Sequence, residues 1–203
     1  MLPDASVNDK SSLRSFFRAR RKALSVDETR RRSALIRGHI LQAPSWEQAG
    51  VVALYMAVGG EVDLGPLLDA AFGQKKTVLL PRCSRSHPGH MRLDVCADRD
   101  CLCPGPYGIL EPDHGTLRAA APVPDLVLTP GVAFDARGVR LGAGGGYYDR
   151  LFAQPAYASC LRLGIAYDFQ IVPALPSDVW DTAMHGLCTE HGLTWINQKR
   201  PPL

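Results

Sequence analysis

The chain has 203 residues, 46% of them hydrophobic and 21% charged, a length that suits one well-filled core, so we expect a single domain over residues 1–203. No run of about 18 apolar residues occurs and the N-terminus lacks the basic and apolar regions of a secretory signal, which argues against a membrane association and favours a cytoplasmic protein. The formal net charge of +3 is unevenly spread, because residues 10–37 hold ten Lys or Arg against only Asp27 and Glu28. This basic segment is either a solvated helical face or a contact for an anionic ligand.

The first predicted elements are two basic helices. Residues 10–24 contain no Gly or Pro and can form an apolar stripe, which is typical of a helix. Ser25 and Glu28 have the spacing of a capping box, in which each side chain bonds the other residue's amide. We therefore expect a second helix from about Ser25 to Gln42 that ends before Pro44, with frayed tails outside the fold at residues 1–9 and 198–203.

Buried apolar runs then alternate with helical segments, as in a parallel sheet whose strands are covered on both faces. The predicted buried strands are residues 51–57, 77–81, 125–130, 161–167 and 193–196. A half-exposed strand is expected at 91–96, a helix capped by Asp63 at 64–72, a helix from about Tyr147, and irregular loops at 82–90 and 98–124. The predicted fold class is α/β: an open, mostly parallel, Rossmann-like sheet flanked by helices in three layers, preceded by the basic helical segment.

The segment Arg140–Asp149 has the composition of a phosphate-binding loop. It follows a buried strand and opens a helix, so it should lie at the carboxyl edge of the sheet, where open α/β folds bind ligands. Its glycines permit positive φ and turn successive N–H groups toward an anion. They are Gly142, Gly144, Gly145 and Gly146. Neither G-x-x-x-x-G-K-[ST] nor G-x-G-x-x-G is present, because Tyr147 stands at the last glycine of the second pattern. Asp149 is a candidate for a Mg²⁺ ion that bridges phosphates.

Other candidate residues should reach the same edge of the sheet. Lys10, Arg14 and Arg18 are spaced by one helical turn, so their charges can line one helix face toward a triphosphate. Glu61 follows the first strand and either binds ligand or caps the next helix, and Arg82 ends the second strand where a guanidinium suits a carboxylate or phosphate. Two aromatic residues could offer stacking surfaces or belong to the core. They are Tyr55 and Phe134.

Together these residues resemble one known family, the 5-formyltetrahydrofolate cyclo-ligases, also called 5,10-methenyltetrahydrofolate synthetases. The resemblance runs from about residue 10 to residue 192 through ordered motifs: K-x-x-L-R at 10–14, E-V-D at 61–63, L-P-R at 80–82, Y-G-I-L-E-P at 107–112, P-G-V-A-F-D-A-R-G-V-R-L-G-A-G-G-G-Y-Y-D-R at 130–150, W-D at 180–181 and T-E at 189–190.

The resemblance implies an enzyme that uses ATP to cyclise 5-formyltetrahydrofolate to 5,10-methenyltetrahydrofolate, releasing ADP and phosphate. It implies catalytic roles for Lys10, Arg14, Arg140 and Tyr148. Implied ATP contacts are Lys10, Arg14 and Arg140 with Leu141, Gly142, Ala143, Gly144, Gly145, Gly146, Tyr147 and Tyr148. Implied or candidate folate contacts are Glu61, Tyr55, Arg82, Gly144, Gly145, Gly146, Tyr147 and Tyr148. Mg²⁺ is implied at Asp149, with Asp181 or His185 as further candidates, because His185 stands where relatives commonly carry a second metal-binding Asp.

Several alternatives remain open. The basic N-terminus could belong to a nucleic-acid-binding module, although aromatic interleaving and zinc-finger or helix-turn-helix signals are missing. The chain could also be a folate-binding paralogue without catalysis, or, by analogy of fold alone, a sugar-phosphate isomerase or CoA transferase. Cys101 and Cys103 could share a metal with His87 or His90, although C-x-C is a weak signal. We expect a monomer that acts on folate, with or without a polyglutamate tail, and binds neither nucleic acid nor membrane.

Overall fold

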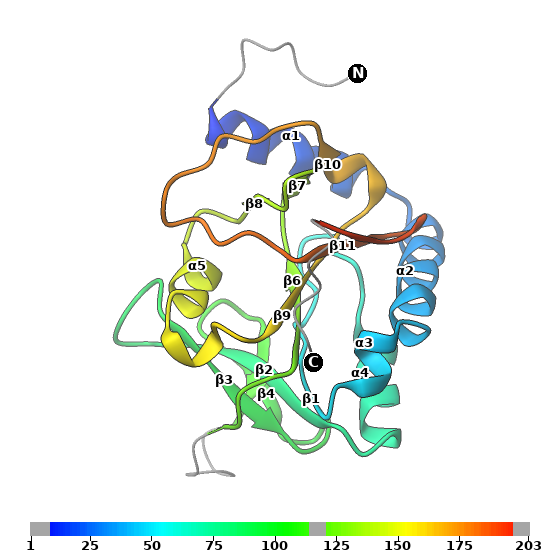
Figure 1. Ribbon diagram of the computed structural model, residues 1–203, viewed down its shortest axis with the longest axis vertical. Coiled ribbons are helices and arrows are strands. Elements are labelled where there is room, and N and C mark those ends of the chain that lie inside the picture. The colour runs from blue at the N-terminus through cyan, green and yellow to red at the C-terminus, as the bar shows by residue number, and fades with distance from the viewer. Residues whose placement is uncertain (1–8, 114–120, 197–203) are drawn as a thin grey trace.

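The computed structural model describes residues 9–113 and 121–196, and its largest element is a seven-stranded sheet (Figure 1). The strand order is β12-β11-β9-β6-β1-β2-β3. The five inner strands pair in parallel, while the edge strands β12 and β3 run antiparallel to their neighbours. The strands are β1 Val51–Ala53, β2 Thr77–Cys83, β3 Met91–Cys96, β6 Leu126–Pro130, β9 Leu161–Ile165, β11 Gly186–Thr189 and β12 Gly192–Trp195. The predicted mostly parallel α/β sheet is therefore confirmed.

Helices cover both faces of this sheet, which gives the predicted three layers (Figure 1). On one face lie α2 Val26–Leu41, α3 Pro44–Gln48 and α4 Gly65–Gly73, and on the other lies α5 Tyr147–Phe152. Successive strand residues point to opposite faces. Thus Val52 packs in the cluster that contains Ile36 and Leu67 of the first helix group, whereas Ala53 packs with Leu151 of α5.

The basic helix α1 Lys10–Lys22 lies across the end of the sheet, over a small sheet of order β10-β7-β8 (Figure 1). These short strands are β10 Ile171–Val172, β7 Ala133–Asp135 and β8 Arg140–Leu141. Phe17, fully buried, packs against Val132 and Leu141 and fixes the helix there. Asp9 caps α1 by accepting a bond from the Ser12 amide, so residue 9 is not a frayed end; residues 1–8 and 198–203 lie outside the described part of the chain.

The helix predictions hold with corrected ends and caps. The helix α1 ends at Lys22 rather than residue 24, and α2 begins after Ser25, whose hydroxyl accepts the Glu28 amide at 3.1 Å. The predicted bond from the Ser25 amide to the Glu28 side chain is wrong, because the Glu28 carboxylate bonds Arg31 and Arg32 instead. Arginine side chains on the same helix face compete successfully for that carboxylate.

Other differences come from short elements. The segment after Pro44 forms α3, with that proline in its first turn, where a missing N–H costs nothing. The carboxylate of Asp63 accepts the Gly65 amide at 2.8 Å from one position before the N-cap of α4. The first strand covers only residues 51–53, and β11 was not predicted. The predicted loop at 98–124 contains a β-hairpin, and its residues 114–120 lie outside the described part of the chain. Two 3₁₀ turns occur elsewhere in the described residues. These elements are β4 Leu102–Pro104, β5 Leu110–Pro112, η1 Pro155–Tyr157 and η2 Asp168–Gln170.

Across residues 9–113 and 121–196, no helix combines the length and the apolar character needed to cross a bilayer.

Candidate functional site

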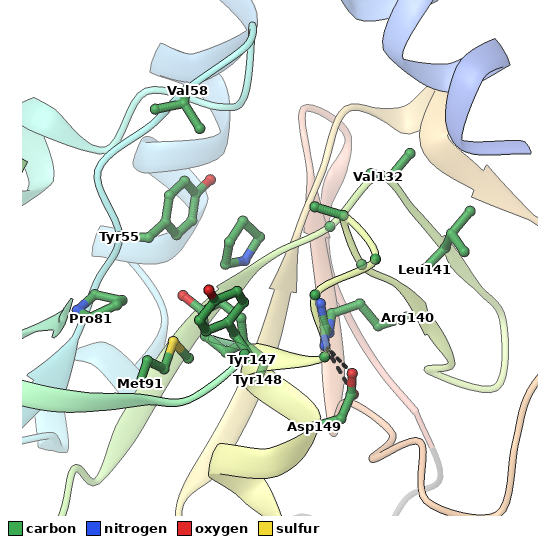
Figure 2. A pocket seen from close by; sticks show the side chains of 18 of the residues that line it. Tyr55, Val58, Pro81, Met91, Val132, Arg140, Leu141, Tyr147, Tyr148 and Asp149 are labelled. Atoms are coloured by element: carbon green, nitrogen blue, oxygen red, sulfur yellow. Dashed lines mark hydrogen bonds and ion pairs between the residues drawn. The ribbon is translucent and has the colours of Figure 1, made fainter. Parts of the chain in front are cut away.

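A cavity of about 1270 Å³ opens beyond the carboxyl ends of β1, β2 and β6, where α1 faces the start of α5 (Figure 2). Its walls come from segments that are far apart in sequence: α1, the turn after β1, the end of β2, the 107–111 hairpin, the 130–149 segment and the 178–181 loop. Open α/β sheets place ligands at this edge. The fold therefore brings most of the predicted site residues to one cavity.

The glycine segment forms one wall of this cavity. Gly144 and Gly146 have φ values of 112° and 66°, in the left-handed region that suits glycine, and Gly146 is the N-cap of α5. A side chain at Gly145 would meet the Tyr147 ring at 2.6 Å. The backbone from Ala143 to Gly145 is exposed, so its polar groups can approach a ligand directly. This arrangement suits an anion with several oxygens.

The basic face of α1 is anchored on that glycine segment. The Arg14 Nε donates to the Gly142 carbonyl oxygen at 2.9 Å, and an Arg18 amino group donates to the Ala143 carbonyl oxygen at 2.9 Å. Both partners are neutral, so each guanidinium keeps its full positive charge. The predicted alignment of these side chains on one helix face is confirmed, and their charges lie beside the exposed glycine backbone.

Lys10 lies on the same helix face but has acidic partners. Its ammonium donates to Asp178 at 2.7 Å and to Asp181 at 3.1 Å. Burial by itself lowers the pKa of Lys10, but the bonds to the two carboxylates outweigh that effect and raise the pKa above its usual value. Sequence alone gave no signal for the Asp178 contact. Lys10 thus joins α1 to the 178–181 loop.

Arg140 and Asp149 form a mostly buried pair inside the cavity wall (Figure 2). One amino group of Arg140 donates to both carboxylate oxygens, at 2.9 and 3.0 Å, and the guanidinium lies 5.2 Å from the centre of the Tyr148 ring. The Arg140 Nε is buried without a hydrogen-bond partner in the described chain. Burial, as the largest cause, raises the Tyr148 pKa, so this phenol stays protonated.

The cavity offers few protein side chains that could bind a metal ion. Within the described residues, no three His, Cys, Asp or Glu side chains lie close enough together to hold an ion. Asp149 and Asp181 line the cavity, each already bonded to a cation. Magnesium often uses one or two carboxylates and takes its other oxygens from phosphate and water. The residues therefore fit a nucleotide-borne Mg²⁺ and do not fit a closed, all-protein metal site, including one built on Cys101 and Cys103.

Glu61 lines the cavity and does not cap α4, whose first amide is bonded by Asp63 instead. Its Oε2 accepts the Val58 amide at 3.2 Å, and its Oε1 lies 3.6 Å from an Arg21 amino group. Burial is the largest effect on this carboxyl and raises its pKa. Nearby, the ring of Tyr55 lines the cavity, and its buried hydroxyl donates to the Val62 carbonyl at 3.0 Å (Figure 2).

Two predicted residues point away from the cavity. Arg82 pairs with Asp94 across β2 and β3 at 3.1 Å, because its strand neighbours Pro81 and Cys83 occupy the cavity face. Alternation along the strand thus turns the Arg82 guanidinium to the opposite side, and we remove it from the candidate folate contacts. Phe134 is fully buried in the core, so the alternative assignment to the core holds for it.

His185 also lies outside the cavity lining. Its Nδ1 is 3.0 Å from the Arg162 amide nitrogen, and its Nε2 is 3.0 Å from the Arg162 guanidinium. Burial first, and then the positive charge of Arg162, lower the pKa of His185 to about 4. The ring is engaged between β9 and the start of β11, so we leave His185 out of the candidate magnesium ligands.

Sequence reasoning missed several cavity residues. Arg21 is buried beside Glu61, and at the cavity wall the hydroxyl of Tyr107 lies 2.6 Å from that of Tyr147, which the sequence had already marked as a ligand contact. Trp180 lines the rim with two thirds of its surface exposed. Arg21 could have been found, since it lies seven residues after Arg14 and therefore on the same helix face.

This geometry defines a class of protein: an α/β protein that binds an anionic small molecule in a cavity at the carboxyl edge of a parallel sheet. Comparison with known proteins makes the assignment specific. The model of the 5-formyltetrahydrofolate cyclo-ligase family matches residues 6–190, and the chain belongs to that family.

The sequence similarity to individual relatives extends over nearly the whole length of each relative. The chain is 30% identical over 174 residues to the 5-formyltetrahydrofolate cyclo-ligase of Escherichia coli strain K12, covering 85% of this chain and 95% of the relative. It is 31% identical over 184 residues to the Haemophilus influenzae cyclo-ligase, covering 88% and 96%. A solved structure, the 5,10-methenyltetrahydrofolate synthetase of Aquifex aeolicus, superposes with a TM-score of 0.81 at 35% identity over 96% of each chain.

Proposed function

We propose that this chain catalyses the ATP-dependent cyclisation of 5-formyltetrahydrofolate to 5,10-methenyltetrahydrofolate, with release of ADP and phosphate. Membership of the cyclo-ligase family carries the proposal. The cavity supports it, because a glycine loop beside free arginine charge and a buried carboxylate lie in its walls together. An ATP-dependent reaction on a polar heterocycle needs both kinds of contact in one place.

For the nucleotide, we assign the triphosphate to the glycine segment 142–146 and to the cations around it. Arg14 and Arg18 supply positive charge there, because within the described residues their guanidinium groups donate to the neutral carbonyl oxygens of Gly142 and Ala143. Arg140 is buried in the same wall, and its Nε, which has no hydrogen-bond partner among the described residues, can donate to a phosphate oxygen. Lys10 can join them when it leaves its acidic partners. Magnesium, bound through Asp149, would neutralise phosphate charge.

For the folate, we assign the pterin to Glu61 and to the aromatic walls formed by Tyr55 and Tyr148. A carboxylate can accept two N–H groups from a 2-amino-4-oxo pterin ring. Tyr55 keeps its position through the bond to Val62, and burial raises its pKa well above the usual value, so it remains neutral. These contacts would hold N5 and its formyl group toward the nucleotide.

The chemistry follows from the poor leaving ability of a formyl oxygen. That oxygen attacks the γ-phosphorus, ADP departs, and the product is an iminium phosphate at N5. N10 then attacks the formyl carbon, loses its proton, and expels phosphate to close the ring. The residues named above position the two substrates and neutralise the negative charge that builds up first on the departing ADP and then on the departing phosphate.

The test is a turnover assay with purified protein, 5-formyltetrahydrofolate and MgATP. We expect the absorbance of the methenyl product to rise with one ADP released per ring closed, and neither signal when ATP is omitted. Binding of both substrates without ADP release above background would overturn the proposal and favour a non-catalytic paralogue.

A further inference from the structure

Arg21 is a buried cation that the nucleotide assignment does not use. Its side chain is 6% exposed, and it lies in the cavity wall at the junction of α1, the turn after β1 and the turn after β6. One amino group donates to the Gly131 carbonyl at 3.3 Å, and the same atom lies 3.6 Å from Glu61 Oε1. Its Nε is buried without a hydrogen-bond partner in the described chain.

The turn after β1 is shaped to admit this side chain. Gly59 and Gly60 have φ values of 58° and 78°, and a side chain on Gly60 would come within 3.4 Å of the Arg21 backbone oxygen. The turn therefore lies directly against α1. Glu61 follows this turn immediately, so the helix and the carboxylate are held together by backbone packing as well as by charge.

The contact with Arg21 leaves the Glu61 carboxylate able to accept hydrogen bonds from a ligand. Its Oε2 is engaged by the Val58 amide, while a separation of 3.6 Å from Arg21 is too long for a hydrogen bond. Arg21 therefore acts on Glu61 mainly through its charge, and Oε1 remains able to accept an N–H group. A buried carboxylate needs such a charge, since burial alone favours its protonated form.

We propose that Arg21 is a positioning residue of the folate site, which keeps Glu61 ionised and aimed into the cavity so that it can accept N–H groups of the pterin. This inference rests on the proposed function for its substrate and adds a residue to it. Arg21 acts through Glu61 and takes no part in the bonds that form or break.

The charged and titratable groups that face Glu61 support this role. Burial raises the Glu61 pKa, while Arg21, and more weakly Arg18, oppose that rise from α1. Tyr55 and Tyr148 face it from the other walls, and burial raises the pKa of both, so neither carries charge near neutral pH. Removing Arg21 should therefore let the Glu61 pKa climb, and folate binding should fall as pH drops through the new value.

The test compares Arg21→Met and Arg21→Lys with Arg20→Met, a control at the adjacent, exposed position on the same helix. For Arg21→Met we expect the KM for folate to rise about tenfold or more at pH 7, the loss typical of one charge-assisted hydrogen bond. That KM should rise further as pH falls, whereas the KM for ATP should not change with pH. The folate KM of Arg21→Lys should lie between the values for wild type and Arg21→Met, and the folate KM of Arg20→Met should equal that of wild type.

A carboxyl ¹³C NMR titration gives a readout that needs no turnover. The Glu61 pKa should be higher in Arg21→Met than in wild type. Equal Glu61 pKa values, or folate KM profiles that stay parallel across pH, would overturn the inference and leave Arg21 a purely structural residue. Absence of wild-type turnover would instead defeat the proposed function while the titration still tests the pair.

Arg21→Met could fail to fold, because it leaves a buried carboxylate without its cation. In that case the double variant Arg21→Met with Glu61→Gln should fold, since neither charge remains. The pH profile of Arg21→Lys then decides the inference. A small rise in the Glu61 pKa of Arg21→Lys, with a folate KM that rises as pH falls through that value, supports the inference, and a loss of folate binding that does not depend on pH contradicts it.

Discussion

Replacing Asp149 with Asn tests whether the carboxylate that bonds Arg140 also binds magnesium. The change keeps the side-chain shape and one of the two oxygens that accept from Arg140, at 2.9 and 3.0 Å, but removes the negative charge. The side chains of Arg140 and Asp149 are 5% and 20% exposed, so water compensates the lost charge only in part.

The structure sets the size of the effect on stability. Deleting one partner of a buried ion pair costs roughly 3–5 kcal/mol. Because Asn keeps one acceptor and Asp149 is partly solvated, we expect about 2 kcal/mol in the free energy of unfolding. For a chain of this length that corresponds to a fall in melting temperature of roughly 4–8 °C.

The effect on ATP should depend on magnesium. Without Mg²⁺, Asp149→Asn removes a carboxylate from beside the phosphates, so ATP should bind at least as tightly as it binds wild type. With Mg²⁺, the variant lacks the proposed ligand, and the gain in ATP affinity on adding Mg²⁺ should shrink at least about tenfold, or about 1.4 kcal/mol.

Calorimetric titration of ATP with and without Mg²⁺ measures that gain directly. Asp181→Asn, which removes one of the two carboxylate charges that bond Lys10, is the matched control. An unchanged gain in Asp149→Asn would refute the reasoning, and a loss in Asp181→Asn alone would move the magnesium site to the 178–181 loop.

Two further predictions concern other residues of the basic face and the sheet edge. Arg14→Ala removes the bond to Gly142 and should weaken ATP binding by about 1.5–3 kcal/mol, whereas unchanged ATP affinity with loss of salt-sensitive DNA binding would favour the nucleic-acid alternative. The folded-state pKa of His185, about 4, lies below its unfolded value, so wild type should lose stability as pH falls from about 6.5 toward 4. His185→Gln should lack this contribution, and parallel curves of melting temperature against pH for the two proteins would contradict the assignment.

The sheet and the main helices could be predicted because their signals are local. An apolar run such as residues 125–130 or a Ser25 cap defines its element through neighbours in sequence. The strand β11 has no such signal: its four residues are stabilised by pairing with β9 and β12, and the segment before it mixes polar and apolar residues without a strand pattern. Likewise, residues 54–57 are apolar because they pack in the core or line the cavity, although they are not part of β1. Their apolar composition therefore made the predicted strand too long.

The residues that line the site were easier to predict from the sequence than the residues to which they are hydrogen-bonded. The glycine segment and the spacing of Lys10 and Arg14 identify groups that must lie near the sheet edge. The bond from Lys10 to Asp178 joins residues 168 positions apart, and no local pattern encodes it. For Arg82, strand periodicity was available in the sequence and indicated the correct face only once the register of β2 against the cavity was known.

The hydrogen-bond partners of the four cations imply different roles for them in anion binding. Within the described part of the chain Arg14 and Arg18 donate to neutral carbonyl oxygens, so they contribute most of the positive potential that a triphosphate meets first. Lys10 and Arg140 are bonded to carboxylates and add little net charge until those partners are neutralised or move. If Asp149 held magnesium, its carboxylate would no longer compensate Arg140, whose guanidinium could then bond phosphate. Metal and nucleotide should therefore bind cooperatively, because each removes the charge that opposes the other.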